Sequence, residues 1–197
     1  MKLILASGSP RRAQILRDAG FVFETIPTDA DETRHTGEAA EAYVKRIATA
    51  KASAAQKLLE KANQRPIVIA ADTVVLVGGE TLLKPKDADD ARRMLRMLSG
   101  GFHEILTGLA ILNLPDGTET FCVEKTRVEF LPLSEDHIEN YLNTGEPFDK
   151  AGAYGIQAIG GRFVARIDGC YFNVMGLPLS RVWTELRKHG FKDDKPR

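Results

Sequence analysis

The chain has 197 residues, of which 43% are hydrophobic and 27% are charged, and its formal net charge is zero. This length allows one substantial core, and the composition is ordinary for a globular protein. The absence of net charge argues against a broad electrostatic grip on nucleic acid or on an anionic membrane. No apolar stretch approaches the roughly 18 residues of a membrane span, and the first apolar run is too short for a signal peptide. We therefore expect a cytoplasmic protein.

A strand followed at once by a helix start opens the chain. Residues 3–6 form a short apolar run that predicts a buried strand. Ser9 suits the N-cap of the helix, with a proline directly after it. Arg11 and Arg12 then stand in the first turn, where the helix terminus is already partly positive. Together with the hydroxyl of Ser7 and exposed backbone N–H groups, they favour an anion site over two solvated arginines.

The rest of the chain alternates strands and helices, and hairpins dominate its second half. Strands are expected at residues 21–28, 67–77 (one bent strand or a pair), 81–83, 105–114, 118–130, 163–167 and 171–174. Helices are expected at residues 38–63, 87–99, 134–143 and 179–189, with a glycine-rich loop at 145–161. This order predicts an α/β fold with a mixed sheet. We expect a single domain over residues 1–191 and a charged tail at 192–197.

Two charged residues interrupt otherwise apolar patterns. Asp72 lies in the middle of residues 67–77, where an unpaired buried carboxylate would be costly. It is expected to meet a cation, a metal or hydrogen-bond donors, or to lie at a strand end that faces a cleft; the alternative is a structural aspartate that caps a turn with Thr73. Lys51 falls on the apolar stripe of residues 38–63, where a core residue belongs. It is either a snorkelling lysine or a lysine that faces bound phosphates.

Two loops carry further candidates for ligand binding. Asp29, Asp31 and Glu32 form an acidic cluster that is either a solvated loop or the source of a ligand for Mg²⁺. Mg²⁺ needs only one or two protein carboxylates when substrate phosphates supply other ligands. Residues 146–157 combine glycines, both signs of charge, an aromatic ring and an amide. The glycines permit close approach to a ligand, and the amide of Gln157 could both donate to and accept from a base edge.

Six short motifs are spread along the chain: residues 7–12 (SGSPRR), 71–73 (ADT), 84–85 (KP), 101–108 (GFHEILTG), 149–157 (DKAGAYGIQ) and 173–178 (NVMGLP). In this order they resemble the motifs of the Maf family of nucleoside triphosphate pyrophosphatases, over residues 3 to about 186. The segment GAYGIQ at residues 152–157 is similar to the branch that acts on dTTP and UTP.

The resemblance implies a mixed sheet with flanking helices, in two lobes around a deep cleft, similar to the inosine triphosphate pyrophosphatases. It implies hydrolysis of dTTP and UTP, or of modified pyrimidine triphosphates, to the monophosphate and pyrophosphate, which would clean the nucleotide pool. It further implies a divalent metal, Mg²⁺ or Mn²⁺, and a homodimer. The alternative is a nucleotide-binding regulator of cell division and septum formation with little turnover. The carboxylate within an apolar strand favours the enzyme.

The resemblance also assigns roles to individual residues. Asp72 would be the proton acceptor, and Glu32 or Asp72 would hold the metal. The positions that set substrate choice would be Arg11, Thr73 and Gln157. As a hypothesis for the mechanism, a triphosphate would lie against the first loop and helix start, with two lysines adding point charges, so that the phosphate-binding residues are Ser7, Ser9, Arg11, Arg12, Lys51 and Lys84.

Overall fold

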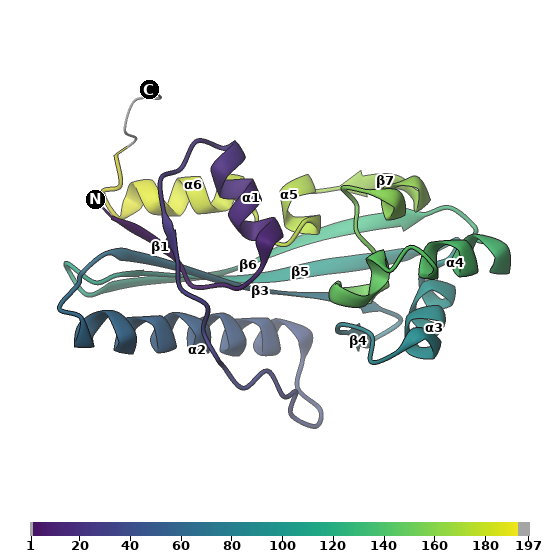
Figure 1. Ribbon diagram of the computed structural model, residues 1–197, viewed down its shortest axis with the longest axis horizontal. Coiled ribbons are helices and arrows are strands. Elements are labelled where there is room, and N and C mark those ends of the chain that lie inside the picture. Colours follow the sequence, from purple (N-terminus) through teal and green to yellow (C-terminus); the bar gives the residue numbers. More distant parts are fainter. Residues whose placement is uncertain (1, 193–197) are drawn as a thin grey trace. The chain divides into compact units, whose positions relative to one another are not determined.

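The computed structural model describes residues 2–192 (Figure 1). The end of the expected charged tail, residues 193–197, lies outside the described residues. The described chain divides into two compact units. Unit 1 contains residues 2–72, 107–124 and 176–192, and unit 2 contains residues 73–106 and 125–175. No helix within residues 2–192 is both long and apolar enough to cross a membrane.

A seven-stranded sheet is formed by the described residues, in the order β2-β1-β3-β5-β6-β7, and β4 pairs with β3 outside this path. The strands are β1 (Leu3–Leu5), β2 (Glu24–Thr25), β3 (Ile67–Val77), β4 (Glu80–Leu82), β5 (Phe102–Asn113), β6 (Thr118–Phe130) and β7 (Val164–Asp168). Strand β1 is parallel to both β2 and β3, whereas β4 is antiparallel to β3 and β7 is antiparallel to β6. The predicted α/β class with a mixed sheet is confirmed. Strand β3 passes from unit 1 to unit 2 between Asp72 and Thr73.

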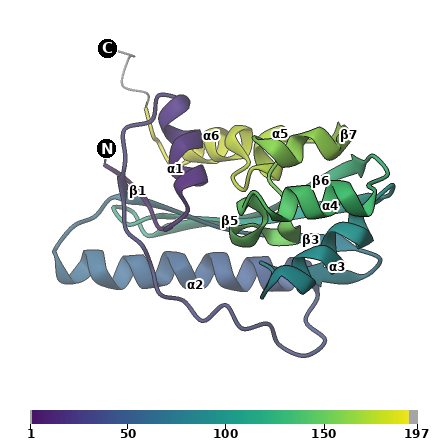
Figure 2. The same cartoon turned by 45° about the vertical axis from the view of Figure 1, so that its right-hand side comes forward.

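Unit 1 has helices on both faces of its strands. Figures 1 and 2 show α2 along one face and α1 and α6 along the other. Side chains alternate between faces along a strand, so Ile4 and Val68 pack among the alanines of α2 while Leu3 is buried on the opposite face. A Cβ on Gly108 of β5 would lie 2.3 Å from the carbonyl oxygen of Val44, so glycine lets α2 pack closely there. The helices are α1 (Pro10–Asp18), α2 (Ala40–Lys61) and α6 (Leu179–Lys188).

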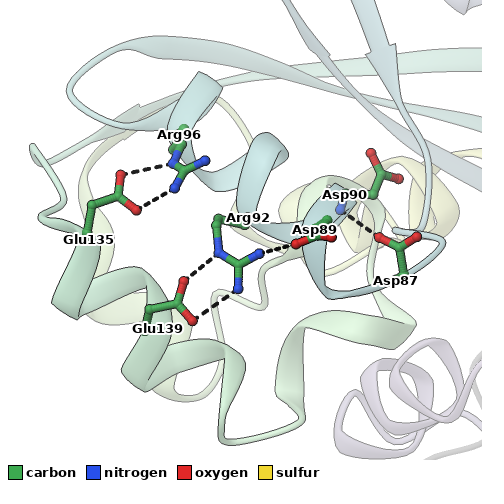
Figure 3. Close-up of polar contacts among 7 residues, drawn as sticks. All are labelled: Asp87, Asp89, Asp90, Arg92, Arg96, Glu135 and Glu139. Atoms are coloured by element: carbon green, nitrogen blue, oxygen red, sulfur yellow. Dashed lines mark hydrogen bonds and ion pairs between the residues drawn. The ribbon is translucent and has the colours of Figure 1, made fainter.

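Unit 2 has its own core, in which α3 and α4 pack with the strands of this unit. Within this core the rings of Phe130, Tyr154 and His103 meet edge to face, and Phe163 extends the group from Phe130 to Tyr141. Across the outer side of the two helices, Arg92 pairs with Glu139 and Arg96 pairs with Glu135 (Figure 3). Exposed ion pairs contribute little to stability, so the apolar core holds the helices together. The helices of unit 2 are α3 (Ala88–Leu98), α4 (Glu135–Leu142), the short α5 (Tyr171–Val174), and the 3₁₀ turns η1 (Glu146–Asp149), η2 (Ala151–Ala153) and η3 (Ile159–Phe163).

The helices expected at residues 87–99 and 134–143 are present, and each begins at a side-chain cap. The side chain of Asp87 accepts a hydrogen bond of 2.8 Å from the backbone N–H of Asp90 and so begins α3 (Figure 3). Ser134 caps α4 in the same way and forms a reciprocal capping box with His137.

Two strand predictions are wrong. The strand expected at residues 21–28 is reduced to β2, which has only two residues. The strand expected at residues 171–174 is the one-turn helix α5. There the amide of Asn173 is fully buried and donates to the carbonyl oxygen of Ile105 and to Oγ1 of Thr126. These tertiary contacts outweigh the strand propensity of Tyr, Phe and Val in this segment.

Candidate active site

The loop between β1 and α1 places two hydroxyls and a buried arginine at a helix start. Ser9 is the N-cap, as predicted, with extended backbone, but its side chain makes no capping hydrogen bond. The backbone N–H of Ser9 instead donates to Oγ of Ser7 at 3.1 Å. Nη1 of Arg12 donates to the same oxygen at 3.4 Å. The Ser7 hydroxyl therefore joins the loop backbone to the first turn of the helix.

Arg12 is buried, so the alternative of a solvated arginine is wrong at this position. Its Nε donates to the carbonyl oxygen of Gly176 at 2.7 Å, and only 8% of the residue is exposed. Burial lowers the pKa of Arg12, whereas the negative charge of Asp72 raises it and the positive charge of Arg11 lowers it. A guanidinium remains protonated in proteins, so the first turn of α1 carries a fixed, largely desolvated positive charge. Arg11 is half-buried beside it.

Lys51 of α2 joins the two carboxylates that the sequence singles out. Its Nζ lies 2.7 Å from Oδ1 of Asp72 and 2.7 Å from Oε1 of Glu32. The side chains of Lys51 and Asp72 are almost fully buried, while half of the Glu32 side chain is exposed. The prediction that Asp72 meets a cation is confirmed, and Lys51 is not a snorkelling lysine. The negative charges of Asp72 and Glu32 raise the pKa of Arg12, so this arginine interacts electrostatically with the same two carboxylates.

The loop that carries Glu32 is tied to the first turns of α2. The hydroxyl of Tyr43 donates to the carbonyl oxygen of Glu32 at 2.8 Å. Arg46 donates two hydrogen bonds to the carboxylate of Glu38, at 2.7 and 2.8 Å, and one to the carbonyl oxygen of Thr33 at 2.9 Å. Burial raises the pKa of Tyr43, and the negative charges of Asp72 and Glu32 raise it further. Tyr43 therefore stays a neutral donor.

Sequence reasoning missed Tyr43 and Arg46. Tyr43 lies on the apolar stripe of α2, where a tyrosine is easily taken for a core residue. A signal did exist, because a buried tyrosine hydroxyl usually finds a hydrogen-bond partner. For Arg46 the sequence held no comparable signal, because its partner Glu38 precedes the helix in an irregular segment.

The other predicted site residues belong to unit 2. Thr73 directly follows Asp72 in β3 and is half-buried. Lys84, after β4, and Gln157, between η2 and η3, are both exposed. Exposure of Gln157 is consistent with an amide that contacts a ligand. Unit 1 thus contains seven of the predicted residues, which come from the β1–α1 loop, the first turn of α1, the loop before α2, the middle of α2 and strand β3: Ser7, Ser9, Arg11, Arg12, Glu32, Lys51 and Asp72.

The residues that could hold a metal ion are few. Among residues 2–192, no group of three or more His, Cys, Asp or Glu side chains is suited to a metal ion. Asp72 and Glu32 nevertheless present two carboxylates to the single ammonium group of Lys51. Two carboxylates fit Mg²⁺ or Mn²⁺, which take oxygen ligands and are commonly completed by water and substrate phosphates.

The chain is similar to named proteins in both sequence and fold. The chain is 44% identical to a dTTP/UTP pyrophosphatase of Carboxydothermus hydrogenoformans over 191 residues, which cover 97% of this chain and 100% of that protein. It is 47% identical to a dTTP/UTP pyrophosphatase of Clostridium perfringens, over 96% of this chain and 97% of that protein. Its fold is similar to that of the Ham1 protein of Staphylococcus aureus, with a TM-score of 0.53 at 15% identity, over 95% of this chain and 99% of that one.

The family model of Maf-like proteins matches residues 2–189, almost the whole chain. The six motifs lie within this range, and these two relatives match 96–97% of this chain. The chain belongs to the Maf-like protein family.

Proposed function

We propose that this protein hydrolyses dTTP and UTP to the nucleoside monophosphate and pyrophosphate. The names of its relatives support this activity, because the match is 44–47% identical and covers nearly the full length of both partners. The observation that carries the proposal is the buried Lys51–Asp72 pair beside Arg12. Binding an anion alone would gain nothing from a buried carboxylate, whereas hydrolysis needs a group that accepts a proton.

Phosphoryl transfer depends mostly on positioning and on neutralising charge. In the proposed site the first turn of α1 binds the triphosphate, since it combines backbone N–H groups, the Ser7 hydroxyl and the fixed charge of Arg12. Lys51 is a compact point charge that contacts both carboxylates and can also contact phosphate oxygens. The full phosphate-binding set that we propose is Ser7, Ser9, Arg11, Arg12, Lys51 and Lys84.

Asp72 is the proposed proton acceptor. Its carboxylate takes a proton from the attacking water as the water oxygen bonds to the α- or the β-phosphorus. The bond from that phosphorus to the oxygen that bridges the two phosphates breaks, and monophosphate and pyrophosphate separate. Lys51 orients this carboxylate through the hydrogen bond of 2.7 Å to Oδ1. A bound Mg²⁺ or Mn²⁺, held by Asp72 and Glu32, would supply charge neutralisation on the phosphates and a more acidic water.

Substrate choice is assigned to Arg11, Thr73 and Gln157. Uracil and thymine present an N–H donor between two carbonyl acceptors, and a glutamine amide offers both a donor and an acceptor to such an edge. Cytosine presents a different pattern at the same edge, so the amide of Gln157 can discriminate between pyrimidines. We further propose a homodimer that acts in the cytoplasm on free nucleotides, normal or modified, without nucleic acid as a partner.

The test is a hydrolysis assay with purified protein, Mg²⁺ or Mn²⁺, and a panel of normal and modified triphosphates, measuring pyrophosphate and monophosphate. We expect dTTP and UTP to be the best common substrates. Asp72→Asn should lower kcat by about 10²–10⁴-fold, the contribution of a general base. Asp136→Asn, an exposed aspartate of α4, is the matched control and should leave kcat unchanged. Nucleotide binding without turnover would instead favour the regulator of cell division.

A further inference from the structure

Glu146, at the start of η1, has no role in the proposed chemistry. Its side chain nevertheless makes hydrogen bonds to the loop around Gln157. Its carboxylate accepts from the hydroxyl of Tyr141 at 2.8 Å, from the backbone N–H of Ile159 at 3.0 Å and from that of Gly160 at 3.2 Å. Ile159 and Gly160 follow Gln157 by two and three positions. One half-buried carboxylate thus fixes the backbone that follows Gln157.

Tyr141 of α4 fixes the backbone that precedes Gln157. Its hydroxyl accepts from the backbone N–H of Gly155 at 3.1 Å while it donates to Glu146. Burial raises the pKa of Tyr141, so the hydroxyl keeps its proton and remains a donor to the carboxylate. The two side chains therefore form one hydrogen-bonded chain that runs from Gly155, through the tyrosine hydroxyl, to Gly160.

The backbone of residues 155–161 closes on itself around these bonds. A Cβ on Gly160 would lie 2.6 Å from the hydroxyl oxygen of Tyr141 and 2.8 Å from the carbonyl oxygen of Gly155. A Cβ on Gly161 would lie 2.4 Å from the carbonyl oxygen of Ile156. The backbone before Gln157 and the backbone after it are therefore in direct contact, and only glycine fits at positions 160 and 161. Residues 157–159, which include Gln157, are exposed.

A carboxylate suits this position better than any other side chain. Three donors converge on its two oxygens, and an ionised carboxylate only accepts hydrogen bonds. Glutamine at the same position would replace one oxygen by an NH₂ group, which would face an N–H or O–H donor instead of accepting from it. Hydrogen bonds to charged groups are also stronger than neutral ones.

We propose that Glu146 is a positioning residue for substrate choice, which acts with Tyr141 by fixing the shape of residues 155–161 and so the placement of Gln157. The inference rests on the proposed function, in which Gln157 contacts the base. Glu146 itself does not touch substrate in this scheme. Its loss affects how well the base is held, because a loop that samples several shapes must be ordered at the expense of binding.

The test compares Glu146→Gln and Tyr141→Phe with the wild-type enzyme. Each variant should raise KM for dTTP and UTP by about tenfold and change kcat by less than about threefold, the pattern of lost uniform binding. The preference for dTTP over dCTP, measured as a ratio of kcat/KM, should fall in both variants. Glu135→Gln is the matched control, because it removes a carboxylate from the exposed pair with Arg96 in the same unit (Figure 3); its kinetics should match the wild type.

Two further measurements separate positioning from a merely structural role. Gln157→Ala should lower the same preference for dTTP over dCTP. Adding Gln157→Ala to Glu146→Gln should lower this preference little further, because both changes remove the same interaction, that of Gln157 with the base. Exchange of the amide protons of Ile159 and Gly160 should become at least about tenfold faster in Glu146→Gln, while exchange in the core strands stays unchanged.

The outcomes distinguish the two proposals. With an active wild-type enzyme, unchanged KM and unchanged dTTP preference in both variants overturn the inference alone, as does equal loss of kcat/KM on every triphosphate. If the wild type hydrolyses neither dTTP nor UTP, the proposed function fails and the role in substrate choice fails with it.

Discussion

Replacing Lys51 by methionine tests the buried charge pair directly. Methionine keeps the length of the side chain but removes the ammonium group that lies 2.7 Å from Asp72. Breaking a buried ion pair costs about 3–5 kcal/mol, because the remaining charge is buried without its partner. Two features favour the lower end of that range. The charge of Arg12 also acts on Asp72, and Glu32 can turn its half-exposed carboxylate to water. We expect Lys51→Met to lower the free energy of unfolding by about 3 kcal/mol.

A double-mutant cycle measured by urea unfolding separates the pair from its surroundings. Asp72→Asn leaves Lys51 paired with Glu32, so its cost should be smaller, about 1–2 kcal/mol. The double variant removes both charges, and its cost should be at least about 1 kcal/mol below the sum of the single costs. Lys57→Met, an exposed lysine on the same helix, is the control and should stay within about 0.5 kcal/mol of the wild type.

Additive single costs would refute the reasoning, and so would a loss below about 1 kcal/mol in Lys51→Met. Either result would mean that water reaches Asp72 in the native state, so that its charge needs no partner. The proposed role of Lys51 in orienting the general base would then lose its physical basis. Equal slopes of the unfolding free energy against urea in all four proteins are needed for this comparison.

Two more expectations concern unit 2. Burial lowers the pKa of His103 to about 4, so the folded state binds fewer protons than the unfolded chain between pH 6.5 and 4; stability should be full above pH 6.5 and fall by about 3 kcal/mol as the pH drops to 4. In His103→Phe the free energy of unfolding, measured with urea, should depend less on pH across this range. An unchanged pH dependence would contradict the lowered pKa of His103 as its cause. Gly152→Ala should cost at least about 2 kcal/mol, because a Cβ there would lie 2.7 Å from Cγ2 of Val75. Gly117→Ala has a similar positive φ but no atom within 4 Å, so its cost should be limited to the backbone strain of about 1 kcal/mol.

Regular elements were predictable because their signals are local. Strand β3 coincides with the predicted residues 67–77, and the helices expected at residues 87–99 and 134–143 are α3 and α4. The pairing of Lys51 was also within reach, since a charge on an apolar stripe must find a partner. Residues 171–174 were not, because their sequence favours a strand and the burial of Asn173 decides for a helix.

Two of the residues that sequence reasoning missed share one feature. Tyr43 and Tyr141 are both buried helix residues whose rings belong to the core and whose hydroxyls leave it. Each hydroxyl is bonded to a loop: Tyr43 to the carbonyl oxygen of Glu32, and Tyr141 to Gly155 and Glu146. In the sequence such a residue differs from an ordinary core aromatic by one oxygen atom.

Both loops carry exposed residues that the proposed function needs in fixed places, Glu32 in one and Gln157 in the other. An exposed loop has few apolar contacts to fix its shape, and a surface ion pair alone is too weak to do so. A tyrosine whose ring is packed in the core holds its hydroxyl in a fixed position, from which it bonds to the loop. A carboxylate, Glu38 in one loop and Glu146 in the other, then accepts hydrogen bonds from neighbouring backbone N–H groups. The packed core of each unit thus fixes the conformation of one loop through a few hydrogen bonds. Mutations that remove these bonds should change substrate binding and preference before they lower the stability of the fold.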